Sequence, residues 1–132
     1  PTTGGILLAY EVARQLGALA AYAERAEAGA VQRVFRRGTT FPQGARVLVV
    51  DDILTTGGSV RETLAALQAY PVVALGVAVL VDRSTAPVEL GVPLIALARF
   101  EIASWDAAEC PLCQEGLPLI KPGTSAPGQA AS

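Results

Sequence analysis

Apolar runs alternate with polar and helical segments in this chain, and they predict a parallel sheet. The longest runs that favour strands are residues 47–50, 72–81 and 92–98. The first is four apolar, mostly β-branched residues in succession, which is typical of a strand buried on both faces. Residues 59–69 separate the first two runs and carry apolar residues at helical spacing, namely Val60, Leu64 and Leu67. The pattern predicts an α/β fold with an open, mainly parallel sheet.

The amino-terminal part predicts a helix and a hairpin. Residues 6–16 form an amphipathic pattern that Gly17 closes, and a small-residue turn, Pro1–Gly5, precedes it. Residues 18–24 are short and apolar, which favours another strand. Residues 31–37 would place Val31, Arg33 and Phe35 on one side of an extended segment and Gln32, Val34 and Arg36 on the other, which favours a hairpin arm before the central strand begins at Arg46.

Two acids and a loop of small residues follow the central strand. Asp51 and Asp52 come directly after residues 47–50, and the loop of residues 55–59 reads Thr-Thr-Gly-Gly-Ser before the helix. Strand, small-residue loop and helix start in this order form an anion pocket, because backbone N–H groups converge and the helix dipole favours negative charge. In an open α/β sheet, ligands bind at this carboxyl edge.

An ordinary strand–turn–helix connection is the alternative for this stretch. Ser59 and Glu62 have the spacing of a capping box, and we expect that box to form. It does not explain why two carboxylates are placed side by side ahead of the loop. The stretch contains neither the Gly-x-Gly-x-x-Gly of dinucleotide-binding folds nor the Gly-Lys-Ser/Thr of a Walker loop.

Composition narrows the classes of function. The net charge of −2 and the pI near 5.0 argue against a nucleic-acid-binding surface. No apolar run approaches the ~20 residues of a membrane span, and no charged and apolar leader opens the chain. Histidine is absent, so the commonest general base and metal ligand is not available. Two cysteines in a cysteine-poor chain fit a reducing cytoplasm, which is the expected location.

The two cysteines form a Cys-x-x-Cys pattern at Cys110 and Cys113. This is half of a zinc ribbon without its other half, so a metal shared across a dimer is one alternative. A redox pair is another, although no thioredoxin-like strand and helix surround it. We favour small packing residues at the end of the fold. Residues 104–109 just before it predict a short capped helical turn.

The stretch from Val47 to Val60 resembles the phosphoribosyl-diphosphate motif of the type I phosphoribosyltransferases at every position. Two further features resemble the orotate phosphoribosyltransferases, particularly a bacterial and archaeal branch. One is Arg83, which follows Asp82 at the end of residues 72–81, where those enzymes hold the carboxylate of orotate. The other is the ending of the chain, Cys-Pro-Leu-Cys followed by Gly-x-Pro-Leu-x-Lys-Pro-Gly.

The resemblance implies a role for each site residue. Asp51 and Asp52 would lie beside the ribose hydroxyls and stabilise a cation-like sugar, and Thr3 and Gly4 would hold the diphosphate. The remaining substrate-binding positions are Ile53, Leu54, Thr55, Thr56, Gly57, Gly58, Ser59 and Arg83. Family members close a mobile loop over the reacting centre; residues 26–45 would form it, and the cations available there are Arg25, Arg33, Arg36 and Arg37.

The loop departs from the family pattern because it lacks the lysines and histidine of many orotate enzymes. Arg25 is the expected catalytic cation, although arginine donates a proton less readily than lysine. The resemblance also implies Mg²⁺ bound largely by substrate phosphates, with no protein metal cage, and a homodimer.

The expected activity is transfer of a phosphoribosyl group from phosphoribosyl diphosphate to orotate, giving orotidine monophosphate and diphosphate. Two alternatives stay open: a regulator that senses phosphoribosyl diphosphate without turnover, and a purine phosphoribosyltransferase. Residues 1–123 are expected to form a partial phosphoribosyltransferase core, with the family's first strand and amino-terminal hood missing. Residues 124–132, rich in Ser, Ala, Gly and Pro, are expected to be disordered.

Overall fold

A computed structural model describes residues 1–103, 105–106 and 108–117 of the chain. The chain divides into two compact units, Pro1–Glu101 and Ile102–Ser132. The first unit contains all the strands of the described residues and both longer helices. The expected disordered tail lies outside the described residues, and the extent of the core to residue 123 stays a prediction.

The secondary structure of the described residues alternates between helices and strands, as the apolar runs predict. In chain order the elements are α1 (Gly4–Leu16), β1 (Glu24–Arg25), β2 (Arg33–Val34), β3 (Ala45–Leu54), α2 (Gly58–Leu67), β4 (Val72–Asp82), β5 (Leu94–Arg99) and α3 (Pro111–Gln114). Gly17 closes α1 in the left-handed conformation, φ 64°, as expected of a helix-ending glycine.

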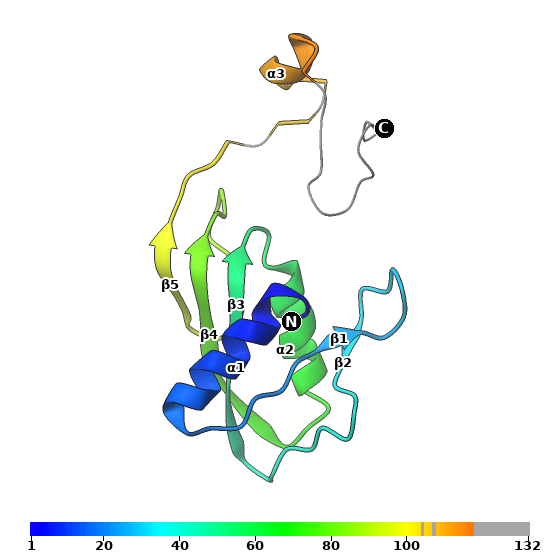
Figure 1. The fold of residues 1–132 in the computed structure, drawn as a ribbon, viewed down its shortest axis with the longest axis vertical. Coiled ribbons are helices and arrows are strands. Elements are labelled where there is room, and N and C mark those ends of the chain that lie inside the picture. Colours follow the sequence, from blue (N-terminus) through cyan, green and yellow to red (C-terminus); the bar gives the residue numbers. More distant parts are fainter. Residues whose placement is uncertain (104, 107, 118–132) are drawn as a thin grey trace. The chain divides into compact units, whose positions relative to one another are not determined.

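The three long strands form a parallel sheet in the order β3-β4-β5 (Figure 1). Each strand is an apolar run with few interruptions, which is what a sheet covered by helices requires. Leu54 at the end of β3 pairs with Asp82 at the end of β4. The carboxyl ends of these two strands therefore lie at the same edge of the sheet. The predicted fold class is confirmed.

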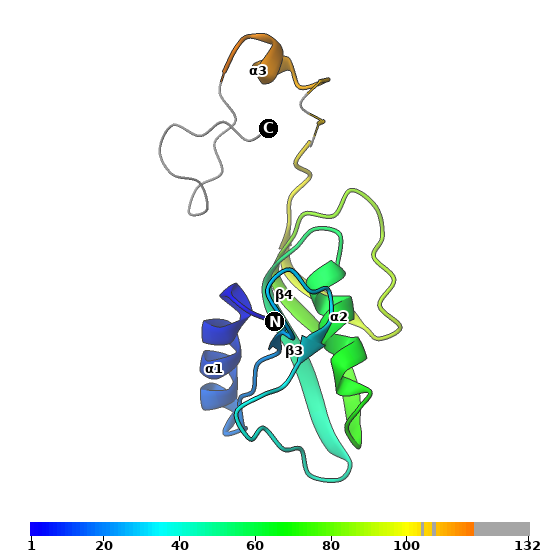
Figure 2. The same cartoon turned by 90° about the vertical axis from the view of Figure 1, so that its right-hand side faces the viewer.

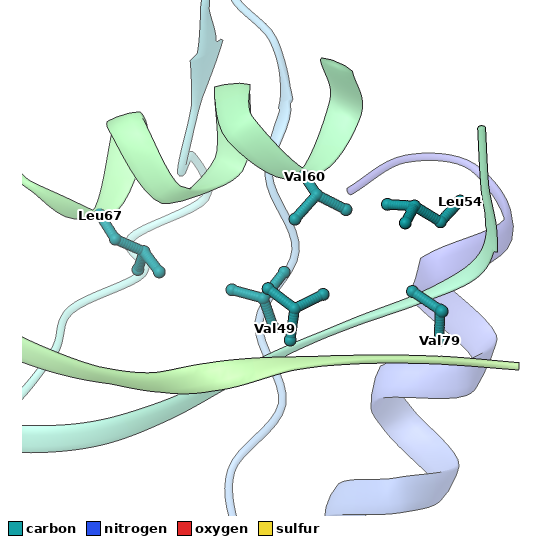
Figure 3. Packing of buried hydrophobic residues seen from close by; sticks show 6 residues of the cluster. Val49, Leu54, Val60, Leu67 and Val79 are labelled. Atoms are coloured by element: carbon teal, nitrogen blue, oxygen red, sulfur yellow. The ribbon is translucent and has the colours of Figure 1, made fainter. Parts of the chain in front are cut away.

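A helix lies on each face of the sheet: α1 contacts β3 on one side, and α2 contacts β3 and β4 on the other (Figure 2). The core forms between α2 and the sheet, where Val60 and Leu67 point from the helix toward the strands (Figure 3). Its buried members are Val49, Leu54, Val60, Leu67, Val77 and Val79. This packing fixes the start of α2 against the end of β3, which is where the acids and the small-residue loop lie.

The predicted hairpin exists, but it is short. β1 and β2 pair antiparallel over two residues each, with Arg25 opposite Arg33. The expected strand over residues 18–24 is wrong, because only Glu24 of that range belongs to a strand. Leu19 is 92% exposed, so this apolar run is not part of a buried sheet. The carbonyl of Ala23 instead accepts the Thr2 N–H at 3.0 Å.

In the second unit, the expected capped helical turn over residues 104–109 stays a prediction, because Ser104 and Ala107 lie outside the described residues. The N–H groups of Glu109 and Cys110 both donate to the carbonyl of Asp106, which closes a single turn. Helix α3 buries none of its residues, and both cysteines are half-buried free thiols. The role of Cys110 and Cys113 as small packing residues stays a prediction. Among the described residues, none of the helices has the length and apolar character needed to cross a membrane.

Truncating Leu67 tests whether packing of α2 holds the sheet edge together. Its side chain is 3% exposed, so Leu67→Ala should lower the free energy of unfolding by about 2–5 kcal/mol through lost burial and a cavity. Leu19→Ala removes the same atoms from a 92% exposed site and should change the free energy of unfolding by less than about 0.5 kcal/mol. Urea denaturation of the two variants measures both values, and equal losses would contradict the assignment of the core.

Candidate functional site

Strand β3 carries both acids inside its hydrogen-bonded length, rather than ending before them as expected. Asp51 is buried at 7% exposure, whereas Asp52 is half-buried. The Asp52 N–H donates to Asp51 Oδ1 at 3.0 Å, and the Ile53 N–H donates to Asp52 Oδ1 at 2.9 Å. These bonds orient the two carboxylates at the carboxyl edge of the sheet.

The loop after β3 forms a hollow at the start of α2. Its volume is about 50 Å³, and it is lined by Asp51 and by residues 53–60 without interruption. Gly57 caps the helix with φ 78°, a left-handed conformation that favours glycine. The residues of the sequence motif therefore line one concave site, and the first-turn N–H groups of α2 lie beside it.

The predicted capping box between Ser59 and Glu62 is wrong. The helix cap is Gly57, without a side-chain cap hydrogen bond, and Ser59 lies inside the first turn. Glu62 instead forms an ion pair with Arg33 at 3.0 Å, because the packing of β2 against α2 offers it a buried guanidinium. The Ser59 side chain is thus left out of helix capping.

The two loop glycines differ in what surrounds them. A Cβ on Gly57 would meet the Val88 side chain and would need a strained backbone, so Gly57 is required for the fold itself. A Cβ on Gly58 would have only Thr56 Oγ1 nearby, at 3.6 Å. Gly58 therefore leaves open space at the helix start, and that space belongs to the hollow.

The amino-terminal turn lies directly against the acid pair. Gly4 begins α1, and a Cβ there would fall on the carboxylate of Asp52. A Cβ on Gly5 would be 3.1 Å from the Val50 carbonyl and 3.2 Å from Asp51 Oδ1. The positive end of the α1 dipole thus faces a carboxylate, which is a favourable arrangement. The structure brings Thr3 and Gly4 together with Asp51 and Asp52, as the sequence predicts.

Arg61 braces the loop from the helix, a contact that the sequence analysis did not identify. Its Nη1 donates to the carbonyl of Thr56 at 2.7 Å, and its Nε donates to the carbonyl of Glu89 at 3.4 Å. The only available signal was a cation five residues after Thr56 in the first turns of α2. This contact connects the loop to the segment after β4.

Arg83 follows β4 at the same edge of the sheet. Its N–H donates to the carbonyl of Leu54 at 2.8 Å, which places its backbone beside the end of β3. In the described part of the chain, Arg83 Nε is the one buried side-chain nitrogen or oxygen without a hydrogen-bond partner. A buried polar atom of this kind normally has a partner, so a ligand group is a natural candidate.

An Asp82–Arg83 surface pair, the alternative for this dipeptide, is not formed. Asp82 Oδ1 accepts the Ser84 N–H at 2.8 Å, and its other oxygen lies 4.0 Å from Arg99 Nε. The hydrogen bonds from Ser84 lower the pKa of Asp82 below its usual value, with a further contribution from Arg99. The Asp82 carboxylate therefore interacts with Ser84 and Arg99 and does not pair with Arg83.

A larger hollow of about 430 Å³ lies along β5 and the segment after β4. It is lined by Asp82, Ser84, Pro87, Val88, Leu94, Ala96, Leu97, Ala98 and Arg99. Most of these side chains are small or apolar, and the acid–loop motif does not contribute to it. The chemistry needed for an anionic ligand is concentrated instead in the smaller hollow at the start of α2.

The expected loop cations behave in two ways. Arg25 and Arg36 are exposed and donate to the carbonyls of Ala30 and Ala26 within the hairpin region. Arg37 is exposed in a left-handed conformation, φ 57°. In the described residues, no hydrogen bond or ion pair connects Arg25 to either acid, so its catalytic role stays a prediction.

Arg33 is not a free loop cation. Its side chain is 3% exposed and is held by hydrogen bonds from three directions. The prediction that Arg33 is one of the cations available in a mobile loop is wrong for this structure, because β2 packs against α2 and turns this side chain toward Glu62.

Burial raises the pKa of the Asp51 carboxyl above its usual value, and the nearby Asp52 adds to the effect. The backbone hydrogen bond from Asp52 opposes it without removing it. A carboxylate kept partly desolvated beside a hollow is a frequent feature of functional sites.

Comparison with known proteins identifies the family. Residues 1–91 match the family described as "Phosphoribosyl transferase domain", and the chain belongs to this family. The matched range contains the amino-terminal turn, the acid pair, the small-residue loop and Arg83.

The chain is also similar to curated orotate phosphoribosyltransferases. It is 46% identical over 124 residues to one from Caldanaerobacter subterraneus subsp. tengcongensis and 47% identical over 124 residues to one from Pelotomaculum thermopropionicum. Each match covers 94% of this chain and 64% of the relative, so the chain spans less than two thirds of their length.

Solved structures agree with the fold. The crystal structure of orotate phosphoribosyltransferase from Aeropyrum pernix superposes with a TM-score of 0.59 at 28% identity, covering 76% of this chain and 58% of that one. Adenine phosphoribosyltransferase from Rhodothermus marinus superposes with a TM-score of 0.51 at 19% identity over 75% of this chain and 66% of that one, which supports the fold alone.

The raised pKa of Asp51 predicts a measurable pH dependence. Between the unfolded pKa of about 3.9 and the higher folded value, the folded protein retains a proton that the unfolded chain has released. The free energy of unfolding contributed by Asp51 therefore falls as pH rises through this window, and it stays lowered above it. Asp51→Asn should unfold at higher urea concentration than the wild type at pH 7, with a smaller difference near pH 3.

The control is Glu89→Gln, which neutralises an exposed carboxylate and should change stability by less than about 0.5 kcal/mol. A stability gain for Asp51→Asn that is the same at pH 3 and pH 7 would contradict the proposed cost of burial.

Proposed function

We propose that the protein transfers a phosphoribosyl group from phosphoribosyl diphosphate to orotate, which gives orotidine 5′-monophosphate and diphosphate. The observation that carries the proposal is the packing of the Pro1–Gly5 turn onto the acid pair of β3, next to the Thr55–Ser59 loop. We call these segments the diphosphate turn and the phosphate loop. They offer two helix starts at one sheet edge, suited to the two anionic ends of a single substrate.

The phosphate loop is suited to the 5-phosphate of the substrate. The loop and the start of α2 line a hollow of about 50 Å³, and Gly58 adds no side chain to it. The hydroxyls of Thr55, Thr56 and Ser59 add donors, and the Ser59 side chain takes no part in a helix cap. Dipole and donors together favour an anion here without a lysine.

The acid pair is suited to the sugar. Asp51 and Asp52 lie between the diphosphate turn and the phosphate loop, where the ribose of a substrate held at both ends would lie. Their negative charge stabilises positive charge that develops on the sugar as the bond from C1 to the diphosphate oxygen breaks and a bond to the orotate nitrogen forms, while the proton on that nitrogen passes to the leaving diphosphate or to water. Catalysis of this kind depends on positioning and electrostatics and needs no histidine.

The same arrangement fits Mg²⁺. The Asp52 carboxylate lies against Gly4 of the diphosphate turn, so hard oxygen ligands stand next to the proposed diphosphate position. Mg²⁺ prefers such oxygens together with substrate phosphates and water, and when bound it would neutralise charge on the leaving diphosphate. Asp51 and Asp52 are the residues placed to hold it, directly or through water.

Arg83 supports orotate as the acceptor. Its buried Nε lacks a partner among the described residues, and its backbone adjoins the end of β3. A guanidinium at this edge can bind a carboxylate in a charge-assisted, bidentate contact, and orotate carries a carboxylate that uracil and the purines lack. The curated relatives named above are orotate phosphoribosyltransferases, which agrees with this choice. A homodimer, a cytoplasmic location and a catalytic role for Arg25 remain predictions from the family resemblance.

Gly58→Val tests the phosphate loop. A Cβ there would meet only Thr56 Oγ1, at 3.6 Å, and the rest of the valine side chain would occupy the hollow, so affinity for phosphoribosyl diphosphate should fall about 10- to 100-fold, the value of one charge-assisted hydrogen bond. Calorimetric titration measures the affinity, and circular dichroism confirms folding. Ala65→Val places the same residue on an exposed position of α2 and should bind normally. Unchanged affinity in a folded Gly58→Val protein would refute the loop assignment.

Arg83→Ala tests the acceptor. With the complete protein, activity with orotate should fall about ten- to a hundredfold, and the preference for orotate over uracil should narrow. Affinity for phosphoribosyl diphosphate should change little, because Arg83 contributes to the acceptor side. If the wild type turns over a purine base without depending on Arg83, the orotate assignment is wrong. If it binds phosphoribosyl diphosphate but forms no nucleotide from any base, a sensing role replaces the enzyme.

A further inference from the structure

The guanidinium of Arg33 connects three segments that are far apart in the chain. Its Nε donates to Glu62 Oε2 at 3.0 Å, and its Nη1 donates to Thr2 Oγ1 at 3.1 Å and to the Ala23 carbonyl at 3.2 Å. The side chain is 3% exposed. A buried cation is tolerated only when it is paired and hydrogen-bonded, so Arg33 favours the arrangement in which all three acceptors surround it.

Two of these acceptors belong to the two halves of the proposed site. Thr2 lies in the diphosphate turn, directly before Thr3 and Gly4. Glu62 lies in α2, about one helical turn after the phosphate loop. The third acceptor strengthens the connection, because the Ala23 carbonyl also accepts the Thr2 N–H at 3.0 Å. Arg33 therefore joins the diphosphate turn to the helix that presents the phosphate loop.

We propose that Arg33 is a positioning residue that fixes the distance between the diphosphate turn and the phosphate loop. The inference rests on the proposed function, which assigns these segments to opposite ends of one substrate. A ligand held at both ends gains affinity when its two sites are held in the correct relative position beforehand. A ligand held only in the phosphate loop gains nothing from that connection.

The choice of arginine agrees with this role. A planar guanidinium presents several N–H donors in fixed directions and can serve three acceptors at once, whereas a lysine ammonium is a single point charge. The hairpin arginines Arg25 and Arg36 differ, because both are exposed and their contacts, with the Ala30 and Ala26 carbonyls and with Glu24, stay within the hairpin region. Arg33 is thus separated by its contacts from the cations expected to move with the loop.

Thr2→Val provides the gentlest test, because it removes one hydroxyl acceptor and leaves the pair of Arg33 and Glu62 intact. Calorimetric titration of the complete protein would compare phosphoribosyl diphosphate with ribose 5-phosphate, which reaches only the phosphate loop. Affinity for phosphoribosyl diphosphate should fall about three- to tenfold, the effect of one hydrogen bond. Affinity for ribose 5-phosphate should stay within about twofold of the wild-type value.

A second variant, Arg33→Met with Glu62→Leu, removes both charges together, so that neither is left buried alone. The affinity of this variant for phosphoribosyl diphosphate should be at least about tenfold lower than that of the wild type, whereas its affinity for ribose 5-phosphate should stay within about threefold of the wild-type value. The affinity of Arg33→Lys for phosphoribosyl diphosphate should lie between those of the wild type and the double variant. Arg14→Met, which breaks an exposed pair with Glu11 on α1, is the matched control and should bind both ligands normally.

The outcomes separate this inference from the proposed function. Equal losses for both ligands would mean that Arg33 only stabilises α2, and unchanged affinity in the folded variants would mean that it fixes nothing; either result overturns the inference while the function stands. A wild-type protein that does not bind phosphoribosyl diphosphate would overturn the function and the inference together.

Discussion

The parallel pairing of β3 with β4 determines where the acid pair, the phosphate loop and Arg83 lie. Its register places Leu54 opposite Asp82, so the segments that follow the two strands begin side by side. The acid pair, the phosphate loop and Arg83 reach one edge of the sheet for this reason, although up to 32 positions separate them in the sequence. Packing of α2 on the same strands then sets the direction in which the phosphate loop faces.

That edge combines groups whose charges oppose one another. Two carboxylates lie next to a hollow that is suited to an anion, and they would repel it if they acted alone. The starts of α1 and α2, on opposite faces of the sheet, supply partial positive charge from both sides. A site built in this way can hold an anionic substrate at its ends and still present negative charge at its centre, where the sugar becomes positive.

The sequence was sufficient for the fold class and for the central motif. Long apolar runs determine parallel strands, and the residue order of acids, small loop and helix places its own members close together. Contacts between segments that are distant in the chain could not be predicted from the sequence. Glu62 has the spacing of a capping box, but its partner is Arg33, because β2 packs against α2. Local spacing cannot show which of two partners is nearer in space, and a buried ion pair outcompetes an exposed cap.

The arginines of residues 25–37 also show that local sequence does not predict which side chains become buried. The basic segment offers Arg25, Arg33, Arg36 and Arg37 without distinguishing them, yet in the fold Arg33 is buried and the other three are exposed. The strand predicted for residues 18–24 was wrong for a related reason. Hydrophobicity predicts a strand only where a neighbouring strand is available, and here the backbone of Ala23 is used by Thr2 and Arg33.

The close contact between Gly4 and Asp52 constrains how this sequence can vary. Any side chain at position 4 would occupy the space of the Asp52 carboxylate, so the two positions share one volume. A side chain at position 4 would require either a smaller residue at position 52 or a displaced Asp52 carboxylate, whereas Gly4 is compatible with any smaller residue at position 52. The constraint therefore acts in one direction, and a library that randomises position 4 while Asp52 is retained should return mostly glycine at position 4.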